Sequence, residues 1–301
     1  MGRGPAAAEE AGAGRPAPTG PGATLVTGAS GLIGSALVAA LAGSRPVLAM
    51  SRREAPPGVP AVRADFTDPA GLAALGGCRI DSAVHLAAVT GGCSEEDGLR
   101  VNVAGTARLL RYLAAAGCRR FVLASSIAAV GLADADFRPK ALPMPDDHPC
   151  LARDGYGLSK YLMEEVAAYF GRRRPDLEVL CLRLPSIARD DRLPAPRGRG
   201  PLRAWALAGI TVMALSDTVR LLAAVLDAPA RPGFRVRNAA PSRAWVAEPT
   251  AGILEEWYGG AVDLAPYRRP GHEWDSVFDS GRLAAEVGFA AAVLPPAPGQ
   301  G

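Results

Sequence analysis

One stretch near the start of the chain constrains the fold more than any other: ATLVTGASGLIG, residues 23–34. Its first five residues have the apolar character of a buried strand, and a helical pattern begins at Leu32. The glycines between them have separate uses. Gly28 allows a tight turn, Gly31 leaves room for a pyrophosphate near the main chain, and Gly34 lets the helix pack closely. An ordinary strand-to-helix turn would also explain the spacing, but strand, glycine turn and helix together favour a dinucleotide-binding βαβ unit.

A strand-and-helix rhythm continues beyond this turn. The expected strands lie at residues 46–51, 59–64, 80–88, 120–126 and 177–184, and the longest expected helices begin at Leu99 and Tyr156. After residue 185 the rhythm weakens. Residues 189–203 are rich in Arg, Pro and Gly, which is typical of a mobile loop. Shorter elements are expected at 218–226, 233–238, 246–257 and 281–287.

Composition narrows the class of protein. The 301 residues are 49% hydrophobic, enough for one sizeable core or for one main domain with a smaller lobe. The near balance of 33 basic and 30 acidic residues argues against nucleic acid or an anionic membrane as the main partner. Five scattered cysteines without a CxxC pair suit reduced thiols in the cytoplasm, and three histidines show no metal-ligand spacing. Residues 1–22 lack the apolar core of a signal peptide and are expected to be a disordered tail.

The end of the second expected strand indicates which cofactor binds. An acidic residue there would accept hydrogen bonds from a free ribose 2′-hydroxyl, but this chain has Ser51, Arg52 and Arg53. A guanidinium group suits a 2′-phosphate, so Arg52 favours NADP over NAD. The other interpretation is that both arginines face water. Asp65, after the third expected strand, stands where a carboxylate could accept from the adenine amino group.

A tyrosine and a lysine four residues apart carry the candidate chemistry. Tyr156 and Lys160 share one helix face, and Ser126 ends the strand before that helix. A tyrosine has a pKa of about 10, and a neighbouring ammonium group with an oxidised nicotinamide ring would bring it toward neutrality. A serine at the strand end could bind the substrate oxygen. The pair could also arise by chance on an amphipathic helix, but its place after the glycine turn favours a proton-transfer site.

Three further polar residues have simpler interpretations. Asn102 stands on a largely apolar helix face and needs a specific partner, because burying it unpaired is costly. His85 is expected to be a packed strand residue rather than a base. Asp68 before Pro69 is expected to cap a helix. The small Ala87 and Ala88 would let the backbone lie against a cofactor.

Together these residues resemble the extended short-chain dehydrogenase/reductase superfamily, in its NAD-dependent epimerase/dehydratase family. The resemblance covers about residues 23–290. The motifs that carry it are TGASGLIG (27–34), Asp65, HLAA (85–88), NVAGT (102–106), Ser125-Ser126, YGLSK (156–160), Arg183, and FDSGRL with VGF (278–289).

The resemblance implies an α/β fold: a Rossmann doubly wound parallel sheet with a small C-terminal substrate lobe. It implies that Tyr156 is the acid/base, that Lys160 holds the nicotinamide ribose and lowers the tyrosine pKa, and that Ser126 orients the substrate oxygen. The residues expected to bind the cofactor are Gly28, Ser30, Gly31, Leu32, Ile33, Arg52, Asp65, Phe66, Leu86, Ala87, Ala88, Asn102, Tyr156, Lys160 and Leu184. The expected parts are a tail (1–22), a cofactor domain (23–185), a substrate lobe with parts returning to the sheet (186–290) and a second tail (291–301).

Two departures from the family pattern bear on the substrate. Many members carry Tyr-Gly-Pro where this chain has Leu184-Pro185-Ser186, and the lobe is short for a sugar-nucleotide enzyme. The arrangement is more similar to uronate and erythronate dehydrogenases, which are typically NAD-linked, so the resemblance and Arg52 disagree on the cofactor.

We therefore expect an oxidoreductase acting on a small hydroxylated or carbonyl substrate. The alternatives are an epimerase or dehydratase with an internally recycled cofactor, and a cofactor-binding sensor without chemistry. The family also implies a homodimer through the helices that begin at Leu99 and Tyr156. The loops expected to select the substrate, about 89–97, 128–154 and 185–215, carry no recognisable motif.

Overall fold

A computed structural model describes residues 22–295. The N-terminal tail expected at 1–22 lies outside the described residues except for Gly22, and so does the end of the C-terminal tail. A seven-stranded sheet forms the centre of the molecule, with strand order β3-β2-β1-β4-β5-β6-β9 and every neighbouring pair parallel. This arrangement confirms the predicted Rossmann sheet and places the carboxyl ends of all seven strands along one edge.

The elements follow the predicted order closely. The strands of the main sheet are β1 (Ala23–Thr27), β2 (Val47–Ser51), β3 (Ala61–Arg63), β4 (Ile80–His85), β5 (Arg120–Ser126), β6 (Glu178–Leu184) and β9 (Gly233–Asn238). The longer helices are α1 (Leu32–Leu41), the π-helix η1 (Gly98–Gly105) continued by α4 (Thr106–Ala115), α5 (Gly155–Arg173), α7 (Leu215–Asp227), α8 (Thr250–Tyr258) and α9 (Gly281–Val287). The short elements near the site are α2 (Pro69–Ala73), β7 (Ser186–Ala188), α6 (Ala206–Gly209) and β8 (Val212–Ala214).

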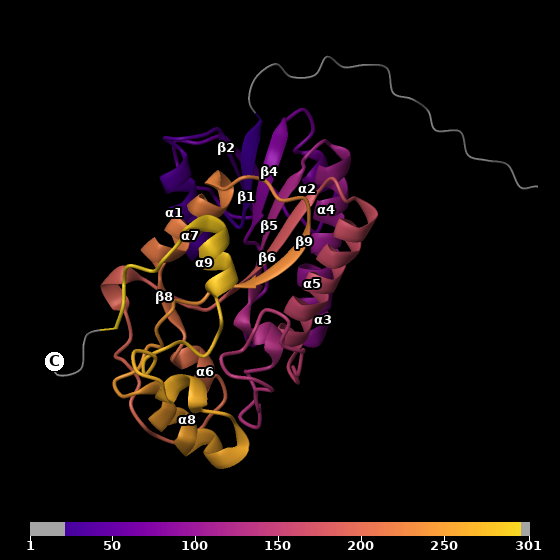
Figure 1. Cartoon of the computed structure of the whole chain (residues 1–301). Coiled ribbons are helices and arrows are strands. Elements are labelled where there is room, and N and C mark those ends of the chain that lie inside the picture. Colours follow the sequence, from indigo (N-terminus) through magenta and orange to yellow (C-terminus); the bar gives the residue numbers. More distant parts are fainter. Residues whose placement is uncertain (1–21, 296–301) are drawn as a thin grey trace, which may run out of the picture.

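Helices cover both faces of the sheet. Figure 1 shows α1, α7 and α9 on one face and α4 and α5 on the other. One buried cluster joins leucines of α1 and α7 to the sheet, and another joins residues of α4 and α5 to the opposite face. Burial on both faces explains why β1, β2 and β6 are mainly apolar runs. Among the helices of residues 22–295, none has the length and apolar character needed to cross a bilayer.

Some boundaries differ from the predictions for local reasons. The helix expected at 246–257 begins only at Thr250, because Pro249 stands before it and cannot continue a helix from the preceding segment. Asp68 caps α2 as predicted, accepting a hydrogen bond from the Ala70 amide at 3.0 Å. The single helix expected from Leu99 is divided into a π-helical part and a regular part.

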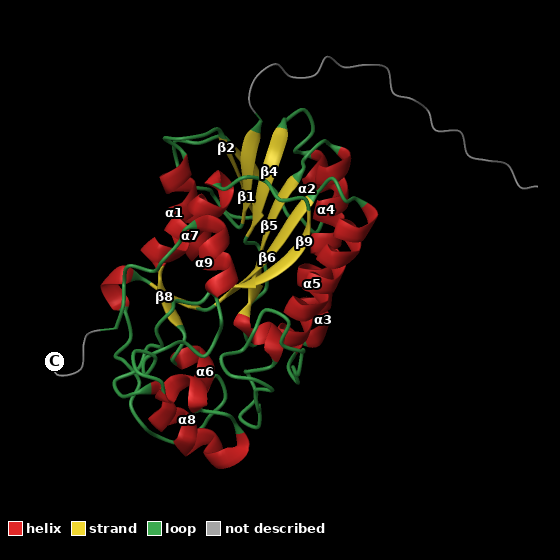
Figure 2. Ribbon diagram, in the orientation of Figure 1, coloured by secondary structure: helices red, strands yellow, loops and turns green. Residues whose placement is uncertain are grey.

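A third buried cluster forms the core of a smaller lobe beyond the strand ends. It combines residues 127–144 with α6, α8 and the segments around residues 240–246 and 277–278. Figure 2 shows this part as mainly loops and short helices. The segment between β5 and α5 therefore contributes to the lobe core, while β9 belongs to the main sheet and α7 and α9 pack on that sheet. The proposed division at residue 185 stays a prediction.

The segment expected to be a mobile loop, 189–203, is held by contacts from distant residues. The indole of Trp245 donates to the Pro194 carbonyl at 2.8 Å, and that of Trp257 donates to the Gly200 carbonyl at 2.8 Å. Part of the expected C-terminal tail is also held, because the Ala292 and Val293 amides donate to the buried Asp217 carboxylate at 2.9 and 2.8 Å.

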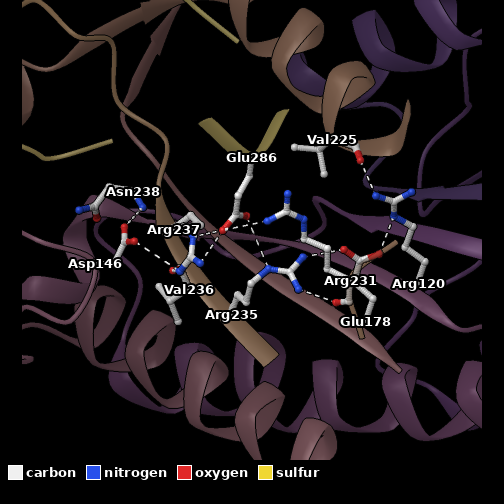
Figure 3. Close-up of polar contacts among 10 residues, drawn as sticks. All are labelled: Arg120, Asp146, Glu178, Val225, Arg231, Arg235, Val236, Arg237, Asn238 and Glu286. Carbon is white, nitrogen blue, oxygen red and sulfur yellow. Dashed lines mark hydrogen bonds and ion pairs between the residues drawn. The ribbon is translucent and has the colours of Figure 1, made fainter. Parts of the chain in front are cut away.

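A ladder of ion pairs runs over the side of the sheet that ends in the edge strand β9 (Figure 3). Arginines and carboxylates alternate along it, with successive nitrogen–oxygen distances of 3.0, 2.6, 3.6, 2.6 and 3.4 Å. Its members in order are Arg120, Glu178, Arg235, Glu286, Arg237 and Asp146. The ladder thereby joins strand β9 to helix α9 and to the segment before α5.

Candidate active site

A cavity of about 850 Å³ lies across the carboxyl ends of β1, β2, β4 and β5. Its position spans the point where the strand order reverses between β1 and β4, which is where ligands bind in open α/β sheets. The sequence-predicted residues that line it are Gly28, Ser30, Gly31, Leu32, Ile33, Arg52, Asp65, Phe66, Leu86, Ala87 and Ala88. Sequence reasoning did not single out Arg100, Thr67 or Thr90, which line the same cavity.

The first helix presents a free N-terminus to this cavity. Its cap residue is Gly31, with no side-chain hydrogen bond, and its first turn holds no acidic residue. Gly28 has φ +69°, and a Cβ there would stand 2.8 Å from the Ala87 amide nitrogen. Only glycine fits such a turn. The open amides and the helix dipole at this point suit a phosphate group.

Three arginines and one aspartate line the other end of the cavity. Arg52 and Arg53 follow β2, and Arg100 projects from η1. The Asp65 carboxylate accepts hydrogen bonds of 2.8 Å from both the amide and the hydroxyl of Thr67. Burial would raise the pKa of Asp65, but these hydrogen bonds and the charges of Arg52 and Arg100 hold that pKa below its ordinary value. The cavity end is therefore cationic, with an ionised carboxylate held among the arginines.

Tyr156, Lys160 and Ser126 meet beside the cavity although they are not among its lining residues. The Lys160 ammonium donates to the Ala124 carbonyl at 2.7 Å, and Ala124 belongs to the cavity wall. Its nitrogen lies 5.8 Å from the Tyr156 ring centroid. The Tyr156 phenol is hydrogen-bonded to Ser126, which ends β5. The strand end, the cavity wall and the first turns of α5 thus bring these three side chains together.

Burial is the largest influence on the electrostatics of this group. Burial raises the pKa of the Tyr156 phenol, and the Ser126 hydrogen bond only partly opposes that shift. Burial also lowers the pKa of Lys160 to about 8. The expected shift of the tyrosine pKa toward neutrality requires an oxidised nicotinamide ring as well as the lysine, so it stays a prediction.

His85 and Asn102 hold the site together from behind. The buried His85 ring lies 2.6 Å from the Thr27 hydroxyl and 3.0 Å from the Thr106 hydroxyl, and burial lowers its pKa to about 3. It is the packed residue that the sequence predicted. Asn102 accepts from the Val89 amide and donates to the Val89 carbonyl, each at 2.9 Å.

The side-chain amide nitrogen of Asn102 also donates to the hydroxyl of Ser159 in α5, at 2.9 Å. Asn102 therefore joins the loop after β4 to the helix that carries Tyr156. Leu184 is buried at the end of β6, in register with Ser126. Neither Asn102 nor Leu184 is among the residues that line the cavity.

Trp205 covers the tyrosine on the lobe side. Its ring centroid lies 6.4 Å from that of Tyr156, and a Cβ on Gly91 would stand 3.7 Å from its indole edge. Trp205 has φ +63°, in the left-handed region that side chains rarely adopt, and 37% of it is exposed. A large aromatic side chain held in a strained conformation beside a proton-transfer residue indicates a functional position.

A buried ion pair supports the tyrosine helix from the other side. The Glu164 carboxylate of α5 accepts from Arg183 of β6 at 3.0 and 2.8 Å and from the Ser125 hydroxyl at 2.5 Å. Arg183 also donates to the Asp146 carbonyl at 2.9 Å. This pair fixes the position of α5, β6 and the segment between β5 and α5.

Comparison with known protein families gives one match over more than half of the chain. Residues 24–188 match the model of the NAD dependent epimerase/dehydratase family. Among curated proteins, UDP-glucose 4-epimerase 4 of Oryza sativa subsp. japonica is 33% identical over 181 residues, which are 53% of this chain and 47% of the relative. UDP-glucose 4-epimerase 2 of the same plant is 31% identical over 109 residues, 35% of this chain and 25% of the relative. The chain thus spans at most about half the length of these relatives.

Solved structures match over nearly the whole chain. MoeE5 in complex with UDP-glucuronic acid and NAD is 25% identical, with a TM-score of 0.63 over 91% of this chain and 95% of that chain. Uronate dehydrogenase from Agrobacterium tumefaciens is 22% identical, with a TM-score of 0.62 over 92% of each chain. At 22% identity, the likeness to uronate dehydrogenase shows a shared fold only.

Proposed function

The chain belongs to the NAD-dependent epimerase/dehydratase family of extended short-chain dehydrogenases/reductases, as its motifs indicated, and on that premise we propose that it is an NAD(P)-dependent oxidoreductase of a small hydroxylated or carbonyl substrate. One observation carries the proposal: Tyr156 is hydrogen-bonded to Ser126 and lies beside the Lys160 ammonium, which is itself bound to the wall of the cofactor-sized cavity. A protein that only sensed a cofactor would have no need of this proton path.

The geometry supports a division of work among the three side chains. Ser126 holds the substrate oxygen, and Tyr156 takes its proton in the oxidation direction or returns it in the reduction direction. Lys160, kept charged below a pKa of about 8, favours the phenolate while the proton is absent. When bound, the nicotinamide supplies or accepts the hydride.

The cavity suits a dinucleotide along its whole length, and we propose NADP as the preferred form. The open N-terminus of α1 would hold the pyrophosphate, and Arg52 with Arg53 would hold the 2′-phosphate. The family as a whole is NAD-dependent, and MoeE5 was solved with NAD. Arg52 is the residue that distinguishes the two cofactors here.

Titration of the purified protein with NADPH and NADH tests the cofactor. We expect the wild type to bind NADPH more tightly than NADH, and an Arg52→Asp variant to bind NADPH about 5- to 10-fold more weakly. This loss is small for a charge-assisted hydrogen bond because Arg52 is exposed. Arg111→Asp, an equal charge change at an exposed position outside the cavity lining, is the control. Equal or NADH-favoured binding by the wild type would remove Arg52 from the phosphate site.

Nicotinamide absorbance on addition of aldoses and their uronic acids tests the chemistry. Tyr156→Phe should lower kcat at least ~100-fold, the usual contribution of a positioned proton donor. Tyr161→Phe, on the next turn of α5, should leave the rate unchanged. Equal rates in Tyr156→Phe and the wild type would contradict the proposed proton transfer.

The second candidate function is epimerisation with a recycled cofactor. The curated relatives that match this chain over 109 and 181 residues are UDP-glucose 4-epimerases, and this likeness favours epimerisation. Conversion of UDP-glucose to UDP-galactose without net change of nicotinamide absorbance would establish it in place of the first.

A further inference from the structure

Trp205 brings the lobe against the tyrosine of the candidate active site. The two ring centroids are 6.4 Å apart and the ring planes are inclined by 38°. The far edge of the indole lies on the loop after β4, where its Cζ2 and Cη2 atoms stand 3.7 and 3.8 Å from the place of a Cβ on Gly91. Thr90, the neighbour of Gly91, lines the large cavity. A substrate held at Tyr156 would therefore lie within reach of the Trp205 indole.

The indole of Trp205 has a binding capacity that the fold does not use. Trp245 and Trp257 are buried, and each donates its indole N–H to a backbone carbonyl at 2.8 Å. Trp205 is 37% exposed, and in the part of the chain that the structure describes its indole N–H has no acceptor. Tryptophan combines a large apolar face with one polar donor, which suits it to binding surfaces. Both the face and the N–H of Trp205 are thus available to a ligand.

The backbone holds Trp205 in a conformation that side chains rarely adopt. With φ +63° and ψ +11° it stands in the left-handed region, immediately before α6. Its carbonyl accepts from the Gly209 amide at 3.0 Å, and the helix is fixed in turn because the Ser186 hydroxyl donates to the Ala208 carbonyl at 2.9 Å. The first three residues of α6 are buried in the lobe core. The aromatic ring is therefore preorganised, and a strained residue kept beside a reacting group indicates a function there.

We propose that Trp205 determines substrate specificity by selecting cyclic molecules: its indole covers the apolar face of a ring, and its N–H donates to an oxygen on that ring. This inference rests on the proposed function, because it assumes that the reacting carbon lies at Tyr156. A closed sugar ring keeps a patch of C–H groups on one face, which an indole can cover. An open-chain polyol has no fixed face and loses more rotational freedom on binding. Trp205 therefore distinguishes ring-form from open-chain molecules of the same size and charge.

Calorimetric titration of the cofactor-loaded protein with two matched pairs tests this role: D-glucuronate against D-gluconate, and D-glucose against D-sorbitol. The members of each pair share chain length and net charge but differ in ring closure. We expect the wild type to bind the ring-form member of at least one pair about tenfold more tightly. Trp205→Gly should reduce that preference about 2- to 10-fold, the value of an aromatic contact. Glycine adopts the left-handed conformation freely, so this variant removes the indole without straining the backbone. Trp205→Phe keeps an aromatic face without the N–H and should lose less of the preference.

Trp274→Leu is the matched control, since Trp274 belongs to the same lobe but its ring lies 5.4 Å from the Arg243 guanidinium, and this variant should leave the preference unchanged. An undiminished preference in Trp205→Gly, or a cofactor-loaded wild type that prefers the ring-form member of neither pair, would overturn the assignment. Cofactor titration of the same variants separates this result from a failure of the proposed function. Trp205→Gly should bind NADPH like the wild type, whereas a wild type that binds neither cofactor would refute the oxidoreductase itself.

Discussion

The buried pair of Glu164 and Arg183 makes a prediction that can be worked out from the structure. The two side chains are only 3% and 4% exposed and share two hydrogen bonds. In Arg183→Met the Glu164 carboxylate keeps only the Ser125 hydroxyl as a donor. Removal of one partner from a buried ion pair costs about 3–5 kcal/mol, because the remaining charge stays buried without compensation.

The double variant should be more stable than this single loss suggests. Glu164→Leu combined with Arg183→Met leaves no buried charge, and such apolar replacements are often close to neutral. The Asp146 carbonyl still loses its donor, about 1.5–3 kcal/mol for a bond to a charged group. We therefore expect an interaction free energy of at least ~2 kcal/mol between the two substitutions, well above the error of a double-mutant cycle.

Urea unfolding of the wild type, both single variants and the double variant measures this coupling. Amide hydrogen exchange adds a local readout, because the Asn238 amide donates to the Asp146 carboxylate at 2.7 Å. Its exchange should be faster in the double variant even where global stability is recovered. Losses that simply add, or single variants that cost below ~1 kcal/mol, would show that Glu164 and Arg183 do not form the coupled, buried ion pair described above.

Three further predictions follow from the site. Between pH 6.5 and about 3 the folded His85 binds fewer protons than it does in the unfolded chain. The free energy of unfolding should therefore decrease as the pH is lowered through that window, by up to ~1.4 kcal/mol per pH unit. His85→Asn should flatten this slope in urea titrations at a series of pH values. Trp205→Ala should raise the substrate KM about 2- to 10-fold, the value of an aromatic contact, without changing the NADPH dissociation constant. Gly34→Ala should cost about 1–3 kcal/mol and weaken NADPH binding, because its Cβ would overlap the Gly28 carbonyl, whereas Gly43→Ala meets no atom and should do neither; an equal effect of both would argue against the steric explanation.

Local patterns were sufficient to predict the sheet and most of the residues that line the large cavity. The glycine turn at residues 28–34 and the pair Tyr156 and Lys160 each depend on spacing within one or two elements. Asp68 and His85 were equally predictable, because a cap and a strand residue are recognised from their neighbours.

The residues that sequence reasoning missed depend on distant contacts. Arg100 resembles any exposed helix arginine until η1 places it beside Asp65. The segment 189–203 has the composition of a loop, but contacts from residues some fifty positions later hold it, among them the indoles of Trp245 and Trp257. The burial that raises the pKa of Tyr156 was missed, because it is a property of the packed lobe rather than of the motif.

The ion-pair ladder also bears on how the protein behaves at high concentration. A sheet edge carries unpaired backbone groups that can recruit a strand from another molecule. At one edge β3 is only three residues long and ends at Arg63. At the other edge β9 is longer, but Arg235 and Arg237 alternate along it and are tied to carboxylates. These ion pairs tie the edge strand to β6, α9 and the segment before α5, so we expect loss of the ladder to loosen β9 first and to lead to aggregation before global unfolding.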